Sequence, residues 1–276
     1  MSRLLSANFA RLKKSSLFWV ALALSAALSV FIMAQRIMTV DEWRKYGAEL
    51  HFESCFFEAT PFVGLAITVV IIFFLGTDYS DGTIRNKITA GHTRVEIYSA
   101  NLLTAIFIGV LLDAVWLVFG LIGLPFMECG LSIGQMLLYV LVTLLFSIST
   151  GALVALAGML ISSKAGSSTV SIMMFFGFLI AASMIIIRLD EPEMHSYMEM
   201  TAEGMQMVGP VANPQYVGGA LRVVYECIAN TLPAGQAIML SNMELEHPVF
   251  DIVISAFLSL FVSAVGLMIF NKKDIK

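Results

Sequence analysis

The sequence predicts an all-α, polytopic membrane protein with six transmembrane helices. Of its 276 residues, 58 % are apolar and 13 % are charged, whereas soluble domains are about 45–50 % apolar and about 25 % charged. The apolar residues form continuous runs that can cross a hydrocarbon core of about 30 Å as helices. A membrane barrel would instead show short segments of alternating hydrophobicity. Six runs have the required length: 17–34, 60–76, 99–126, 133–162, 169–187 and 249–270.

The lengths and compositions of these runs add detail. The third and fourth are longer than a perpendicular span needs, so each can tilt or contain a break. Gly120, Gly123 and Pro125 are the expected break points in the third run, and the small residues at 147–158 predict close helix packing in the fourth. The first run follows basic residues, as a secretory signal does, but it exceeds the usual apolar core of about 7–15 residues. Its length favours a retained span over a cleaved signal.

Lysine and arginine are distributed unevenly between the two sides of a six-span chain. Cytoplasmic loops of membrane proteins are enriched in these residues, so both termini are expected in the cytoplasm, with the chain in the plasma membrane. The side with the termini carries Arg3, Arg11, Lys13, Lys14, Arg85, Lys87, Arg94, Lys164, Lys272, Lys273 and Lys276, and the opposite side carries Arg36, Arg44, Lys45, Arg188 and Arg222.

The segment 1–16 precedes the first span and has helical periodicity. Leu4, Leu5, Phe9 and Leu12 recur at helical spacing, and basic residues accompany them. This pattern is typical of a helix that lies in the cytoplasmic membrane interface, with its basic groups toward anionic lipid. A disordered basic tail is the alternative.

Two larger loops are expected on the outer side. The loop 35–59 is polar and mixed in charge, and is expected to form a short, helix-containing cap. The loop 188–247 begins with an acidic, Met-rich half. Thioethers can bind soft metals, but apolar contacts are the favoured role. Its second half predicts a short helix that rests on or dips into the outer leaflet, with a re-entrant pair as an alternative. The acids are Asp190, Glu191, Glu193, Glu199, Glu203 and Glu226, the methionines are Met194, Met198, Met200, Met205 and Met207, and the periodic residues are Leu221, Val224, Tyr225, Ile228 and Leu232.

A few single residues are candidates for function. Asp113 lies near the middle of the third run, where an acid is costly and often functional. It could face a polar translocation cavity, titrate, or bond a Ser or Thr of span four as a structural acid, and an intramembrane enzyme would depend on it alone. Cys55, Cys129 and Cys227 are expected on the outer side, where one disulfide is allowed, although three free thiols are favoured. Because no His/Cys cluster has metal-site spacing, no metal is predicted.

The most distinctive stretch is a predicted cytoplasmic loop at 78–98, directly after the second span. Ser80 or Asp81 can cap the start of a helix, and Gly91 can cap its end. These caps predict a helix of about two turns.

The side chains of this short helix are expected on two faces. Ile84 and Ile88 share one face at i,i+4 spacing, whereas Arg85 and Lys87 point elsewhere, toward solvent, lipid phosphate or a partner. A short amphipathic helix of this kind is suited to docking in a groove of another protein.

A specific resemblance rests on these residues. The first cytoplasmic loop of permease subunits of type-2 ATP-binding-cassette (ABC) exporters is similar to the motif Tyr79-Ser80-Asp81-Gly82-Thr83-Ile84-Arg85-Asn86-Lys87, followed by Gly91, Arg94, Ile97 and Tyr98. The resemblance covers 78–98 by motif and most of the chain by topology. In that family the loop forms a coupling helix, which sits in a cleft of the ATPase subunit. The resemblance therefore implies contacts with an ATPase through Asp81, Gly82, Thr83, Ile84, Arg85, Asn86, Lys87 and Ile88.

The resemblance also implies partners and a task. Two copies of a separate ATPase would hold ATP and Mg²⁺, and a second copy of this chain, or a homologous permease, would complete the membrane part. The complex would export an amphipathic substrate, such as a peptide, an antibiotic or a lipid-like molecule, from a bacterial cell through the lipid bilayer.

This chain itself lacks the residues for ATP hydrolysis. No G-x-x-x-x-G-K-[ST] phosphate loop occurs in the sequence. The chain is therefore not expected to be an enzyme or to carry a catalytic residue or a cofactor, and no nucleic-acid partner is expected. The alternative is a membrane sensor or scaffold that binds a ligand through its outer loop without transport.

Overall fold

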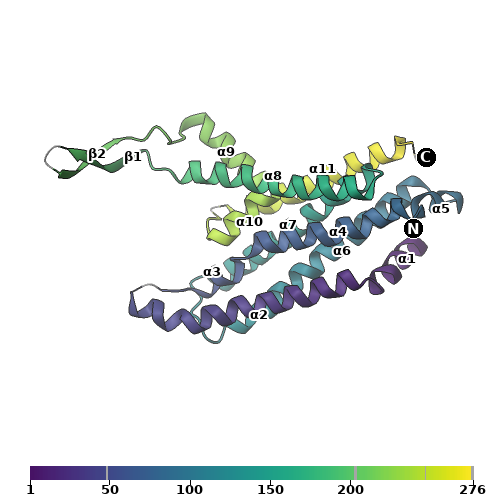
Figure 1. Cartoon of the computed structure of the whole chain (residues 1–276), viewed down its shortest axis with the longest axis horizontal. Helices are drawn as coiled ribbons and strands as arrows, with labels where there is room; N and C mark the ends of the chain where they lie inside the picture. Colours follow the sequence, from purple (N-terminus) through teal and green to yellow (C-terminus); the bar gives the residue numbers. More distant parts are fainter. Residues whose placement is uncertain (48, 202–203, 246, 275–276) are drawn as a thin grey trace.

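The computed structural model describes residues 1–47, 49–201, 204–245 and 247–274. Long helices lie side by side in an elongated bundle, and both chain termini lie at one end of it (Figure 1). We call this end the terminal end, and the opposite end, from which a β-hairpin projects, the hairpin end. The long helices are α2 (Ser16–Lys45), α4 (Thr60–Ser80), α6 (Arg94–Gly120), α7 (Ile133–Leu160), α8 (Lys164–Asp190) and α11 (Pro248–Lys272).

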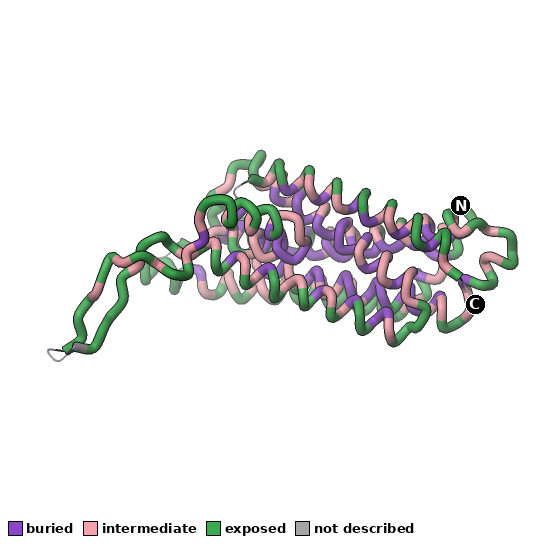
Figure 2. Tube along the Cα trace, turned by 90° about the horizontal axis from the view of Figure 1, so that it is seen from above, coloured by how far each residue is buried: buried purple, intermediate pink, exposed green. Residues whose placement is uncertain are grey.

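Six helical segments of the described chain are long and apolar enough to cross a membrane. They coincide in order with the six predicted runs, so the chain is a helical, multi-pass membrane protein. Buried residues line the interior of the bundle and exposed residues its outer faces (Figure 2). Large apolar side chains such as Trp19, Leu24 and Phe257 are exposed, which suits contact with lipid rather than water.

The first span is longer than predicted. α2 continues past the expected end at Ala34 to Lys45. Neither Gly nor Pro interrupts the segment 35–46, so no local signal ends the helix there. The first such signal is Gly47, whose φ of +75° suits the residue that follows a helix. Much of the expected cap at 35–59 is therefore an extension of α2.

The break predicted in the third run occurs at the first of its three candidate residues. α6 ends at Gly120, and a 3-10 turn, η1 (Leu121–Gly123), follows. A Cβ atom at Gly120 would lie 2.9 Å from the ring of Phe56 in the short helix α3 (Phe52–Phe57). Glycine at this position therefore lets α3 pack closely against the end of α6.

Small residues bring α6 and α7 together in the interior. A Cβ atom at Gly109 would lie 3.0 Å from the carbonyl oxygen of Ser147, and one at Gly151 would lie 3.4 Å from that of Ala105. Membrane helices pack closely where such residues face one another. The close packing predicted for 147–158 is thus confirmed.

The N-terminal segment is helical, as predicted. It forms α1 (Ser2–Lys13), which packs against α6 at the terminal end. Leu4, Asn8 and Leu12 are buried in this contact. The polar residue among them, Asn8, lies where an apolar side chain would be expected, and it belongs to the site described below.

The Met-rich half of the loop 188–247 is a β-hairpin, so the all-α prediction is wrong in this segment. β1 (Met194–Thr201) and β2 (Gly204–Ala212) pair antiparallel and project from the bundle (Figure 1). Each strand has two methionines at i,i+2 spacing, Met198 and Met200 on β1 and Met205 and Met207 on β2, which is the period of a strand rather than a helix. The strand register places Met198 opposite Met207 and Met200 opposite Met205. The predictions that used Glu203 and Lys276 fall on residues outside those described.

The second half of this loop forms two helices that enter the bundle from the hairpin end. They are α9 (Gly219–Thr231) and α10 (Pro233–Asn242), joined at Leu232. A Cβ atom at Gly235 would lie 2.1 Å from the carbonyl oxygen of Ala229, so the two helices touch through their backbones. Pro233 and Ala234 line a cavity of about 20 Å³ together with residues from the interior of α4, α7 and α8. α9 and α10 therefore form a helix pair whose second member begins among the long helices.

Candidate functional site: a buried charge cluster at the terminal end

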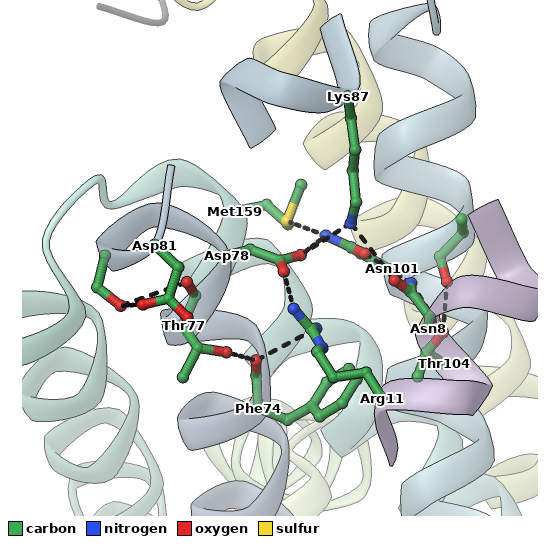
Figure 3. Close-up of polar contacts among 12 residues, drawn as sticks. Asn8, Arg11, Phe74, Thr77, Asp78, Asp81, Lys87, Asn101, Thr104 and Met159 are labelled. Atoms are coloured by element: carbon green, nitrogen blue, oxygen red, sulfur yellow. Dashed lines mark hydrogen bonds and ion pairs between the residues drawn. The ribbon is translucent and has the colours of Figure 1, made fainter. Parts of the chain in front are cut away.

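A cluster of polar side chains joins four helices at the terminal end (Figure 3). Its members come from α1, α4, α6 and the short helix α5 (Thr83–Thr89). We call it the Asp78 cluster, and it consists of Asn8, Arg11, Asp78, Lys87 and Asn101.

Asp78 is the centre of the cluster and is fully buried in the last turns of α4. One carboxylate oxygen accepts a hydrogen bond from the Arg11 guanidinium. The other lies 3.2 Å from Lys87 Nζ and accepts a hydrogen bond of 2.8 Å from Asn101 Nδ2. A buried carboxylate is tolerated when cations and hydrogen-bond donors surround it. Asp78 meets both conditions.

Lys87 lies in the last turn of α5, and its side chain turns toward the protein interior. It is 11 % exposed, and its Nζ also lies 3.4 Å from Asn8 Oδ1. Burial lowers the pKa of Lys87, and the charge of Asp78 opposes this effect. The expectation that Lys87 points toward solvent or a partner is therefore wrong, because the buried carboxylate of Asp78 draws it inward.

Helix α1 is tied to the cluster by two residues one turn apart. The Arg11 guanidinium lies over the Phe74 ring, 4.0 Å from its centroid. Asn8 Nδ2 donates to Asn101 Oδ1 at 2.8 Å and to Thr104 Oγ1 at 3.2 Å. These contacts bind α1 to both α4 and α6.

The predicted cap at the C-terminal end of α5 is confirmed, and the predicted cap at its N-terminal end is wrong. Ser80 is the last residue of α4 and Asp81 its C-cap, whereas the N-cap of α5 is Gly82 with φ +64°. The chain reverses at this glycine because the left-handed conformation costs it little. Gly91 ends α5 as predicted, with φ +89°. The N–H groups of Gly91 and the next residue close the helix on carbonyls of its last turn, as in a Schellman motif.

The two faces of α5 have different environments. Ile84 is buried and Ile88 is half-buried, and both pack in a small apolar cluster of this chain. Asp81, Arg85 and Asn86 are exposed, and α5 lies at the extreme terminal end of the bundle (Figure 1). The apolar face therefore anchors the helix, and the polar face is the one open to a partner.

The C-terminus and the motif residues after α5 add a second set of contacts. Lys273 Nζ lies 2.7 Å from the Tyr79 hydroxyl, which donates to the carbonyl of Met159. Arg94 donates to the carbonyls of Asn271 and Lys273. Burial lowers the pKa of Lys273. These contacts join the ends of α4, α6, α7 and α11 beside the Asp78 cluster.

Two buried acids lie away from this site. Asp113 in α6 is fully buried, and neither of its carboxyl oxygens has a hydrogen-bond partner among the described residues. Ser147 on α7 adjoins it, but its hydroxyl donates to the Thr143 carbonyl at 3.2 Å. Sequence reasoning missed Asp251, in the first turn of α11, which is equally buried and unpartnered in the described structure. The available signal in the sequence was the position of Asp251 inside the apolar run 249–270.

Sequence reasoning also missed most of the Asp78 cluster. Asn8 interrupts the apolar face of α1, and Asn101 interrupts the start of an apolar run. Both are polar residues at positions where burial is expected, which was the only signal in the sequence. The thiols are free: Cys55 is buried, and Cys129 and Cys227 are exposed.

Comparisons with known proteins add no assignment to this geometry. No protein-family model matches the chain, and no curated protein is significantly similar to it. Function must therefore be argued from the residues of the chain.

Proposed function

We propose that the chain is the membrane-spanning permease subunit of an ABC transporter. In this role it couples ATP hydrolysis by a separate ATPase to movement of an amphipathic substrate. The observation that carries the proposal is the arrangement of α5. Its exposed face, with Asp81, Arg85 and Asn86, lies at the end of the bundle. On the opposite side of α5, Lys87 forms an ion pair with the buried Asp78.

This arrangement suits the transmission of force. Removing one partner of a buried ion pair costs about 3–5 kcal/mol, well above thermal energy. A displacement of α5 would therefore be passed on through Lys87 and Asp78 to α4, and through Arg11 and Asn101 to α1 and α6. A protein that binds α5 could thus move several spans together.

The remaining parts of the proposal follow from the same interpretation. The terminal end faces the cytoplasm of a bacterial cell, because most Lys and Arg residues lie on that side. Two ATPase subunits hold ATP and Mg²⁺, and a second copy of this chain or a homologous permease completes the path. Apolar spans with few charges suit a peptide, an antibiotic or a lipid-like molecule.

The test is co-expression of the chain with ABC ATPases encoded in the same genome, followed by co-purification and measurement of ATP hydrolysis. The variant Arg85→Glu/Asn86→Asp changes only exposed residues of α5. We expect it to weaken ATPase association by about tenfold or more, as the loss of a charged contact in an interface does. Lys272→Glu, an exposed charge reversal on α11 at the same end, is the matched control. Unchanged association of the α5 variant would refute the proposal.

A second candidate function is a sensor or scaffold that binds a ligand without transport. The pocket at the hairpin end, described below, favours it. Reconstitution of the chain with its ATPase in vesicles separates the two functions. ATP-dependent flux of a bound substrate supports the transporter, and ligand binding without flux supports the sensor.

A further inference from the structure

A pocket of about 360 Å³ lies at the hairpin end, between α8, α9, α10 and the segment before α11. Its volume is at the lower end of the range of about 300–1,000 Å³ that is typical of ligand pockets. Apolar side chains form part of its wall, among them Ile186, Met239 and Leu245. Methionine adapts its shape to different apolar ligands. This wall therefore suits the apolar part of a small ligand.

The charged lining of the pocket is mostly acidic. It contains Asp190, Glu226 and Glu244 but only one arginine, Arg222. Arg222 is already engaged, because its Nε donates to Glu226 at 2.9 Å and its Nη1 to the carbonyl of Leu189 at 3.1 Å. Two carboxylates thus remain without a cation.

These two carboxylates face the same space. The side chain of Asp190 has no hydrogen bond or ion pair with any residue that the structure describes, and the carboxylate of Glu244 accepts one hydrogen bond, of 3.1 Å, from Asn242. Burial, and next the charge of Asp190, raise the pKa of Glu244. A bound cation would relieve the repulsion between the two acids.

The pocket also contains a buried acceptor without a donor. Asn230 Oδ1 is shielded from solvent and has no hydrogen-bond partner among the described residues. An unmet buried acceptor costs about 1–3 kcal/mol. The carboxylates of Asp190 and Glu244 are acceptors too. The complementary ligand is one that donates hydrogen bonds and carries positive charge.

We propose that this pocket binds an amphipathic cation, with an ammonium or guanidinium group toward Asp190, Glu244 and Asn230 and an apolar body against Ile186 and Met239. The cation could be a Lys or Arg side chain of a peptide or a small organic amine, since the chemistry of recognition is the same. The site does not depend on an ATPase partner, so it can be tested by itself.

The experiment uses the full chain in nanodiscs of neutral phosphatidylcholine, which does not compete for the cation. Fluorescence anisotropy measures binding of the end-blocked, dye-labelled peptide Leu-Lys-Leu, with Leu-Gln-Leu as its neutral counterpart. We expect the lysine peptide to bind about tenfold more tightly. Competition with 4-phenylbutylamine then separates the sources. Weak competition identifies a peptide site and strong competition a site for small amines, and either result supports the proposal.

Variants locate the binding. Asp190→Asn/Glu244→Gln removes both uncompensated charges and should weaken binding of the lysine peptide about tenfold. Glu193→Gln/Glu199→Gln makes the same change in net charge on or beside β1, away from the pocket, and should leave binding unchanged.

A variant with the opposite expected effect excludes misfolding of Asp190→Asn/Glu244→Gln as the reason for weaker binding. Asn230→Asp adds a carboxylate to the pocket and should tighten binding of the lysine peptide severalfold. Equal affinity for the lysine and glutamine peptides would overturn the proposal, and so would equal weakening in the pocket and β1 variants.

Discussion

The two ends of the bundle differ in whether their clustered acidic side chains are paired with cations. At the terminal end, Asp78 lies between two cations, and Asn101 completes its hydrogen bonds. At the hairpin end, Asp190 and Glu244 share a pocket in which the one arginine is already paired. A closed set of charges holds helices together, whereas an open set can hold a ligand. This difference in pairing is the physical basis of the two proposals made above for the two ends.

We expect the largest effect on stability from removing the Asp78 carboxylate, which is the centre of the closed set of charges. Asp78→Ala leaves Arg11 and Lys87 at a buried position without their counter-charge. We expect a loss of about 3–5 kcal/mol in the free energy of unfolding, toward the lower value because Arg11 is 32 % exposed. Unfolding in mixed detergent micelles measures it. The exposed neighbour Asp81→Ala is the control, and an equally small effect of both variants would show that the cluster does not hold the helices.

A smaller effect is expected from crowding the contact between α9 and α10 at the hairpin end. In Gly235→Ala the new Cβ atom would lie 2.1 Å from the Ala229 carbonyl oxygen, a backbone atom that cannot easily move. Overpacking of this kind costs about 1–3 kcal/mol. It should also displace Asn230 and so weaken ligand binding in the pocket. Gly177→Ala in α8, where the added atom meets nothing within 4 Å, should change neither property. If Gly235→Ala were equally harmless, α9 and α10 would not be in backbone contact.

The helix caps provide a comparison in which the two ends should behave alike. A capping box starts α6 at the terminal end, with Thr93 and Glu96, and another starts α7 at the hairpin end, with Ser132 and Gln135. Thr93→Ala and Ser132→Ala should each lower the free energy of unfolding by about 1 kcal/mol. A much larger loss for Thr93→Ala alone would mean that the terminal end depends on more than its charge cluster. The same unfolding assay measures both variants.

Continuous apolar runs predicted the spans, because a helix surrounded by lipid is apolar along its whole length. A cap residue predicted the end of α5, because Gly91 acts on the helix that it directly follows. The inward direction of Lys87 could not be predicted in this way, because it depends on Asp78 in the preceding span and on Arg11 of α1, 67 residues before Asp78. Local rules say where a helix ends but not which distant charge its side chains meet.

Two features of the hairpin end were also not predicted from the sequence. The i,i+2 spacing of Met198 and Met200 and of Met205 and Met207 was visible in the sequence and is the period of a strand, but the sequence prediction used only the composition of this half of the loop. The pocket could not be foreseen, because its lining comes from α8, α9, α10 and the segment before α11, which only the tertiary structure brings together.

The smallest expected effect is a pH dependence that should occur in the open set alone. Because burial raises the pKa of Glu244, this carboxylate takes up a proton on acidification more readily than a solvated glutamate does. Protonation removes a negative charge from the pocket. His247 and Arg222 also line the pocket. Loss of the Glu244 charge disfavours a bound cation, so affinity for the lysine peptide should fall severalfold on acidification.

The variant Glu244→Gln tests whether this carboxylate causes the pH dependence. It should bind the lysine peptide more weakly at neutral pH and lose the part of the pH dependence due to Glu244. The glutamine peptide should show no such dependence, because it carries no charge for the pocket to lose. Binding of the lysine peptide that strengthened in acid would contradict the open, acidic character of this end and would remove the contrast with the closed cluster around Asp78.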